Sequence, residues 1–276
     1  MSEVDLRPMT LGEVLDRTFK LYKSNFLLFA GITAWPFLVL LVINIGFAGS
    51  GLGARPAAGS VPPSGMLPSM IAGGITFGLL YLFLLGAAQA ATVFAVSDLY
   101  LGRPTGLRDC YKRVGAKAVR VIFILLLTGL IVAVGCLLLI IPGIILLCRT
   151  AISVPASMLE DSKSIRSIER SMELTKGFAG QMFVIFLMVW VMSWLVAAIF
   201  QVPFAFLVTA QHTVSFGTLV LQHLSGFVSQ VLVGPIGTIA FSLMYYNLRV
   251  RKEAFDIQHL MASLGPVASP SAPSAA

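Results

Sequence analysis

The sequence predicts an all-α integral membrane protein with about six transmembrane helices. Of its 276 residues, 57% are hydrophobic and 11% are charged, and the mean hydropathy is +0.91, whereas a soluble domain carries about 25% charged residues. Uncharged apolar stretches recur along the chain, and about 20 helical residues cross the roughly 30 Å hydrocarbon layer of a bilayer. Lys and Arg gather between alternate stretches. Lipid must therefore be the solvent for most of the chain.

The N-terminal segment predicts a short amphipathic helix ahead of the first span. Thr10 and Glu13 have the spacing of a capping box, in which a hydroxyl and a carboxylate bond the free amides of a helix start. Acidic residues interspersed with basic ones are untypical of a cleavable signal peptide. Basic, helix-compatible segments also follow Thr105 and Ser164. We therefore expect amphipathic cytoplasmic helices before spans one, three and five, and the pattern leaves open whether these units are a true internal repeat.

Five uncharged or nearly uncharged stretches define the spans. Four of them are single crossings, at 26–48, 70–97, 181–208 and 225–247. The fifth stretch, 121–159, would be about 58 Å long as one helix, so it must turn back. Its natural corner is at Pro142 and Gly143, because proline has no amide hydrogen and glycine tolerates left-handed backbone angles. The resulting spans are 121–141 and 143–159, which makes six.

The positions of the basic residues predict the orientation of the chain. Lys and Arg in short loops stay cytoplasmic, and the four segments that six crossings place inside hold 17 of the 19, all but Arg55 and Arg149. A single crossing at 121–159 would place ten of them outside. We therefore predict a multi-pass protein of the cell inner (plasma) membrane with both termini cytoplasmic. A single transmembrane domain covers 1–264, and the Pro- and Ser-rich tail at 265–276 is expected to be disordered.

Arg149 is the sharpest candidate for a functional residue. A charge within a span costs about 2.5 to 3.5 kcal/mol unless it is paired or reaches the interface, and no span contains a carboxylate to pair with it. One interpretation is structural, with the side chain reaching outer lipid phosphates or carbonyl groups that Pro142 leaves free. The alternative is that Arg149, Thr150 and Ser153 bind an anionic headgroup or carboxylate from the outer leaflet. These three are the predicted ligand-binding residues.

Asp98 lies at the inner end of the second span, ahead of Arg103. The sequence predicts a boundary ion pair between Asp98 and one of the basic residues that follow it, of which Arg103 is the first, and a proton or ion relay is the alternative. Other polar residues within the spans are uncharged and give no support to ion-coupled transport; they include Asn44, Gln89, Thr128, Ser193, Gln230 and Ser242.

Signatures of common enzymes are missing from the sequence. It contains no GxGxxG, GxxxxGK[ST], HExxH or GxSxG pattern. Three cysteines give no disulfide framework and are interpreted as structural free thiols. His259 is predicted to be cytoplasmic, so it cannot join His212 and His223 in a metal site. We therefore expect no catalytic residue, no metal and no cofactor.

Four segments carry a resemblance to a known family. They are YLGRPTGLRDCYKRV at 100–114, IIPGIILLCR followed by VPASMLEDS, SIERSMELTKG at 167–177, and YYNLRVRKEAFDIQHL at 245–260. In this order they resemble the glycerophosphoryl diester phosphodiesterase membrane-domain family, over residues 6–260. In the proteins that named this family the membrane domain is fused to a phosphodiesterase domain with catalytic His and acidic metal ligands. The resemblance implies a stand-alone membrane module, without that activity, of the bacterial inner membrane.

Together these observations predict a non-enzymatic membrane scaffold or accessory module. Its basic inner helices would lie on the anionic inner leaflet, where each Lys or Arg contributes about 1 kcal/mol. Membrane lipids are the expected partners, protein partners stay undefined, and no nucleic-acid partner is expected. The alternative is a transporter or channel for a small anionic or lipid-related solute, with Arg149 as the selective group.

Overall fold

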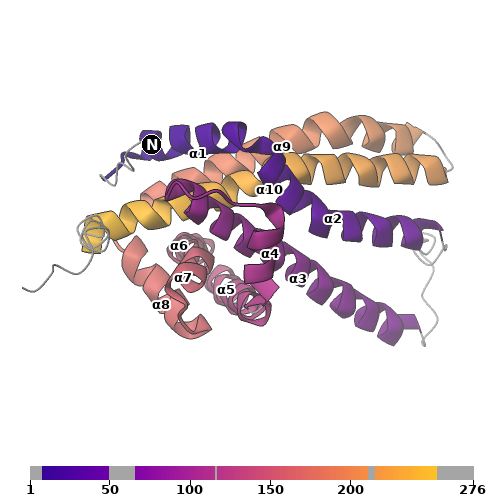
Figure 1. The fold of residues 1–276 in the computed structure, drawn as a ribbon. Coiled ribbons are helices and arrows are strands. Elements are labelled where there is room, and N and C mark those ends of the chain that lie inside the picture. Colours follow the sequence, from indigo (N-terminus) through magenta and orange to yellow (C-terminus); the bar gives the residue numbers. More distant parts are fainter. Residues whose placement is uncertain (1–7, 50–65, 116, 211–214, 254–276) are drawn as a thin grey trace, which may run out of the picture.

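A computed structural model describes residues 8–49, 66–115, 117–210 and 215–253, and these ranges contain ten α-helices and no strand (Figure 1). The helices are α1 (Leu11–Ser24), α2 (Phe26–Gly49), α3 (Met66–Tyr100), α4 (Leu107–Gly115), α5 (Ala118–Leu138), α6 (Ile140–Thr150), α7 (Ser153–Glu160), α8 (Ser164–Thr175), α9 (Ala179–Ala210) and α10 (Phe216–Glu253). The tail at 265–276 lies outside the described residues.

Six helical segments in the described part of the chain are long and apolar enough to cross a membrane. They are α2, α3, α5, the pair α6–α7, α9 and α10. The shorter helices α1, α4 and α8 are amphipathic and precede the first, third and fifth spans. The predicted fold class, an all-α polytopic membrane protein with three such helices, is confirmed.

The α5–α6 hairpin turns at a different residue from the predicted one. The helical backbone is interrupted at Leu139, which is extended with φ −160° and ψ 141°. Pro142 therefore lies in the first turn of α6, where a missing amide hydrogen leaves no bond unmade. Gly143 is required for close packing, because a Cβ there would collide with the backbone and Sγ of Cys136. The sequence correctly identified two special residues but assigned them the wrong role.

The C-terminal half of α10 is the centre of the packed core. Most of its residues from Val233 to Val250 are buried, and α1, α2, α3, α8 and α9 all pack against α10. By contrast, only 17% of the apolar window of α5 and 6% of that of α9 is buried. These two helices therefore present most of their apolar surface to lipid.

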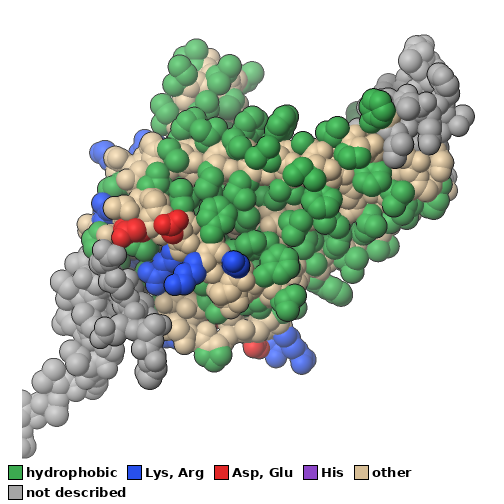
Figure 2. Space-filling view, turned by 90° about the horizontal axis from the view of Figure 1, so that it is seen from above, with side chains coloured by type: hydrophobic (Ala, Val, Ile, Leu, Met, Phe, Trp, Pro, Cys, Tyr) green, Lys and Arg blue, Asp and Glu red, His purple; other side chains and the backbone are tan. Residues whose placement is uncertain are grey.

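All charged residues in the described chain gather at one end of the bundle, which we call the charged end (residues 8–24, 98–120, 149–178 and 245–253). The seventeen Lys and Arg there outnumber the nine Asp and Glu. Figure 2 shows basic side chains toward this end of the molecule and a largely apolar surface along the remainder. The first and last described residues both belong to this end, as an even number of crossings requires.

Candidate functional site

The charged end is held together by hydrogen bonds between helices far apart in sequence. The side chain of Asn247 in α10 accepts a bond from the Met9 amide at 2.8 Å and donates one to the Met9 carbonyl at 3.0 Å. Further along the same contact, the Tyr22 hydroxyl donates to the Leu232 carbonyl at 2.7 Å. Helix α1 therefore lies antiparallel along α10.

An ion-pair network joins α7, α8 and α10. The Glu160 carboxylate lies 3.3 Å from Arg170 Nε and accepts a hydrogen bond from the Tyr245 hydroxyl at 2.9 Å. Arg170 also pairs with Glu253, which lies 3.1 Å from Arg249 Nε. The four charged side chains are 19 to 27% exposed, so the network is partly shielded from water. Glu173 also pairs with Arg170, at 3.7 Å, so three carboxylates face two guanidinium groups and the network adds no positive charge to this end.

Asp98 forms a boundary ion pair with a basic residue that follows it, but this residue is Arg113 and not Arg103. Its carboxylate lies 2.9 Å from Nη1 of Arg113 in α4, whereas Arg103 donates only its backbone amide, to the Asp98 carbonyl. The reason is the chain reversal at 101–106, which includes Gly102 at a φ of 70°. This turn brings α4 back against α3, where the Arg113 guanidinium lies 4.3 Å from the centre of the Phe94 ring. The ion pair therefore fixes α4 to α3.

A second acidic residue ties α5 to the end of α7. Asp161 accepts a hydrogen bond from Arg120 at 2.6 Å and lies 3.1 Å from Lys117 Nζ. These bonds, and the Arg120 bond first of all, hold the pKa of the Asp161 carboxyl below its ordinary value. Asp161 itself has a left-handed φ of 53°, a conformation that Asp and Asn tolerate better than most residues.

A group of basic side chains stands outside these ion pairs and is exposed. We call it the exposed basic surface, and it consists of Lys20, Lys23, Arg103, Arg108, Lys112, Lys163, Arg166 and Lys176. Its members come from α1, from the loop into α4 and α4 itself, and from α8 and its flanking residues. The excess positive charge of the charged end therefore lies on its exposed surface.

A groove of about 460 Å³ lies where α5 meets the start of α8. It is lined by the exposed apolar side chains of Phe123 and Ile165, by the basic side chains of Lys163 and Arg166, and by Ser164 and Glu169. The N-cap residue of α8 is Lys163, which gives no side-chain hydrogen bond to the helix. Ser164 is the first helical residue of α8, and the predicted capping box of Thr10 and Glu13 is confirmed. The N-terminus of α8, with its free amides, borders the groove.

The structure separates the three predicted ligand-binding residues. Arg149 lies in the last turn of α6, about 14 Å along the helix from its first residue. Its guanidinium donates to the Met172 carbonyl of α8 at 3.4 Å, and its own carbonyl accepts bonds from Ser171 and Thr175. The side chain thus points to the charged end rather than to the opposite surface. Arg149 joins α6 to α8.

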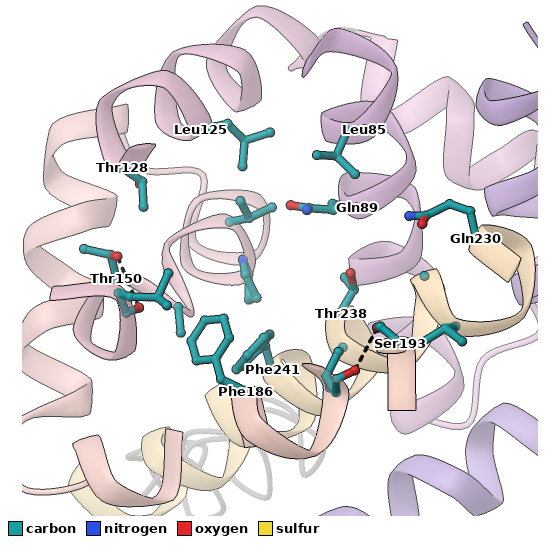
Figure 3. A pocket seen from close by; sticks show the side chains of 18 of the residues that line it. Leu85, Gln89, Leu125, Thr128, Thr150, Phe186, Ser193, Gln230, Thr238 and Phe241 are labelled. Carbon is teal, nitrogen blue, oxygen red and sulfur yellow. Dashed lines mark hydrogen bonds between the residues drawn. The ribbon is translucent and has the colours of Figure 1, made fainter. Parts of the chain in front are cut away.

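Thr150 and Ser153 lie instead on the wall of a central cavity of about 530 Å³ (Figure 3). The cavity is enclosed by α3, α5, α6, α7, α9 and α10, and its described lining contains no Asp, Glu, Lys, Arg or His. Figure 3 shows Gln89 projecting from α3 and Gln230 reaching toward α3 from α10. Sequence analysis identified several of these polar residues but could not predict that they share one space, since they come from separate spans.

Groups of three or more potential metal ligands are absent from the described residues. No protein-family model, no curated protein and no solved structure matches the chain. Within the described residues, the groove at α8 with the exposed basic surface and the central cavity are features with binding potential.

Proposed function

We propose that this chain is a non-enzymatic integral membrane protein that serves as a scaffold or accessory module at the anionic inner leaflet. The observation that carries the proposal is the groove at the start of α8, where two cations adjoin an apolar wall. Such a wall suits an acyl chain, and the cations and helix amides suit a lipid phosphate. The remaining members of the exposed basic surface provide a broader attraction to anionic headgroups.

The pairing of the acidic side chains supports this function. Five carboxylates are engaged in ion pairs within the charged end, those of Asp98, Glu160, Asp161, Glu173 and Glu253. The eight cations of the exposed basic surface are left to face the surroundings. At about 1 kcal/mol for each cation near an anionic surface, they favour the side with anionic lipid. The same bias orients a membrane protein with its basic end in the cytoplasm.

The alternative function, transport of an anionic solute by Arg149, is less well supported. The contacts of Arg149 with Met172, Ser171 and Thr175 give it a structural role at the α6–α8 junction. It is also absent from the wall of the central cavity. The proposal includes no catalytic activity, and sustained hydrolysis of a glycerophosphodiester by purified protein would contradict it.

Lipid retention tests the proposed binding groove. The full chain is purified from membranes into mild detergent, and bound phosphatidylglycerol is measured by mass spectrometry. The double variant Lys163→Gln/Arg166→Gln is expected to retain several-fold less phosphatidylglycerol than the wild type. A matched control, Lys20→Gln/Lys23→Gln, removes the same charge from α1 and should change retention less. Equal retention in all three proteins would contradict the groove, and equal losses in both variants would reduce the site to a general surface charge.

Thiol labelling tests the sidedness. Cys110 and Cys148 are buried and Cys136 is exposed, so a Cys136→Ser background leaves only shielded thiols. We expect Lys112→Cys and Arg166→Cys to resist a membrane-impermeant maleimide in intact cells, and Ser215→Cys, at the opposite end, to react. Labelling of the first two from outside would reverse the orientation and remove the inner-leaflet proposal.

A further inference from the structure

The central cavity has a lining that is polar but uncharged. Amide side chains come from Gln89, Gln201 and Gln230, and hydroxyl groups come from Thr128, Ser229 and Thr238. Apolar side chains, including the packed rings of Phe186 and Phe241, form much of the rest. A volume of about 530 Å³ lies within the range of about 300 to 1,000 Å³ that is usual for small-molecule sites.

Two hydroxyls on this wall have no hydrogen-bond partner among the described residues. They are Thr128 Oγ1 and Ser229 Oγ, both buried, and Ser229 is only 7% exposed. Other hydroxyls of the wall bond a carbonyl one turn back in their own helix, as Thr150 and Ser193 do. A buried polar group without a partner costs about 1 to 3 kcal/mol. The wall of the cavity therefore contains two hydroxyl groups whose hydrogen-bonding capacity is unused within the described chain.

The cavity is elongated along the helix axes. Its lining extends from Phe186 to Gln201 in α9 and from Gly226 to Phe241 in α10, which corresponds to about 22 Å along each helix. Gln201 is exposed and lines the end farther from the charged end. Helix α9 is also among the least buried spans, so much of its surface is available to lipid. The length of the cavity suits an elongated molecule.

Small residues of α10 create the open space. A Cβ added at Gly226 would meet no atom within 4 Å, and Gly226 also lines a second cavity of about 310 Å³ between α2, α3 and α10. Gln230 lies on the wall of both cavities. The Gln230 amide is therefore placed where it could bond the polar part of a ligand while the apolar chain of the ligand extends into either cavity.

We infer that the central cavity is a binding site for an uncharged amphiphile, with hydroxyl or ester oxygens in its polar part and an apolar chain, such as a monoacylglycerol. A charged ligand would lose its hydration without meeting an opposite charge. A hydrocarbon would leave the amides and the two hydroxyls unpartnered. This site is separate from the exposed basic surface, and its test is independent of anionic-lipid retention.

Photolabelling tests the inference directly. The full chain is placed in phosphatidylcholine nanodiscs with a monoacylglycerol that carries a diazirine in its acyl chain. Saturable labelling is expected on peptides of α3, α9 and α10. Unlabelled monooleoylglycerol should compete, while oleate, which has the same chain but a carboxylate, should compete at least about tenfold less well. Labelling without saturation, or equal competition by oleate, would overturn the inference.

A cavity-filling variant and a matched control locate the binding. Gly226→Leu should lower saturable labelling at least about tenfold, because its side chain grows into open cavity space. Gly129→Leu makes the same change on the exposed surface of α5, where a Cβ also meets nothing within 4 Å, and should leave labelling unchanged. Wild-type labelling of a folded Gly226→Leu protein would overturn the inference.

A second variant guards against failure of the first to fold. Ser229→Ala removes an unpartnered hydroxyl, so the protein without ligand should melt at the same temperature or higher. Its apparent affinity for the probe should fall about threefold, the effect of losing one hydrogen bond. Unchanged affinity in Ser229→Ala and also in Gln230→Leu would overturn the inference, whatever the behaviour of Gly226→Leu.

Discussion

The charged end and the central cavity use polar side chains in different ways. At the charged end, hydrogen bonds join separate helices, as Asn247 joins Met9 and Tyr245 joins Glu160. Around the cavity, hydroxyls mostly bond their own helix, or bond nothing in the described chain, as with Ser229. The first arrangement fixes helix positions. The second contributes little to stability and leaves groups available for a ligand.

Asn247 gives the strongest test of the first half of this comparison. Asn247→Leu would remove both hydrogen bonds to the Met9 backbone and leave the buried backbone amide of Met9 without a partner. We expect a loss of about 2 to 4 kcal/mol in the free energy of unfolding. In a Cys136→Ser background, a thiol-reactive fluorescent dye can follow unfolding in detergent, because the remaining Cys110 and Cys148 are buried in the folded state. Burial also raises the pKa of the Cys110 thiol, which lowers its reactivity.

Asn44 provides the matched control for that variant. Its amide bonds the Leu40 carbonyl of its own helix at 2.7 Å and lines the second cavity. Asn44→Leu removes the same functional group but breaks no contact between helices, so its effect should stay below about 1 kcal/mol. Similar losses of unfolding free energy in the two variants would show that the bonds between segments at the charged end stabilise the fold no more than a bond within one helix does.

The fold was predictable because lipid imposes simple requirements on sequence. A span needs about 20 apolar residues, and the amphipathic helices were visible as basic segments with polar and apolar faces. The position of the α5–α6 turn was not predictable, since Pro142 and Gly143 suit both a loop and the first turn of a tightly packed helix. The close approach of Gly143 to Cys136, which only the structure shows, favours the tightly packed helix.

The candidate sites depended on contacts that sequence spacing does not reveal. Asp98 and Arg103 are close in sequence, but the turn between them directs Arg113 to the carboxylate. Arg149 was recognised as unusual, yet its contact with Met172 depends on how α8 folds back. The central cavity was missed because Gln89 and Gln230 are separated by 141 positions in the sequence. The one signal in the sequence was that both are uncharged polar residues within predicted spans.

Two glycines of α10 on the wall of the central cavity differ in the space around them. A Cβ at Gly237 would lie 3.2 Å from Val189 Cγ1, whereas one at Gly226 would meet nothing within 4 Å. Both changes to leucine gain the same helix propensity, up to about 0.8 kcal/mol. We expect Gly237→Leu to unfold about 1 to 3 kcal/mol more easily than Gly226→Leu, because it overpacks the α9–α10 contact. Equal melting temperatures would contradict the placement of the open space.

Asp161 carries the smallest expected effect and tests whether an exposed ion pair at the charged end matters. The bonds from Arg120 and Lys117 lower the pKa of its carboxyl from the ordinary value of 3.8. A group whose pKa is lower in the folded state stabilises the fold above its unfolded pKa, and this contribution is lost as pH falls through the folded value. Asp161→Asn keeps the left-handed backbone position acceptable while removing the charge.

The wild type should therefore melt slightly above Asp161→Asn at neutral pH. The difference should start to shrink as the pH falls below 3.8 and disappear once the pH is below the lowered pKa of the folded state, where the carboxyl is protonated in both states. Melting curves of both proteins from neutral pH downward check this, because other carboxylates titrate equally in the two and cancel in the difference. The gap should also shrink at high salt, since the carboxylate of Asp161 is 65% exposed. A gap that persists after the pH has fallen below the lowered pKa of the folded state would mean that Asp161 acts through its backbone conformation and not through its charge.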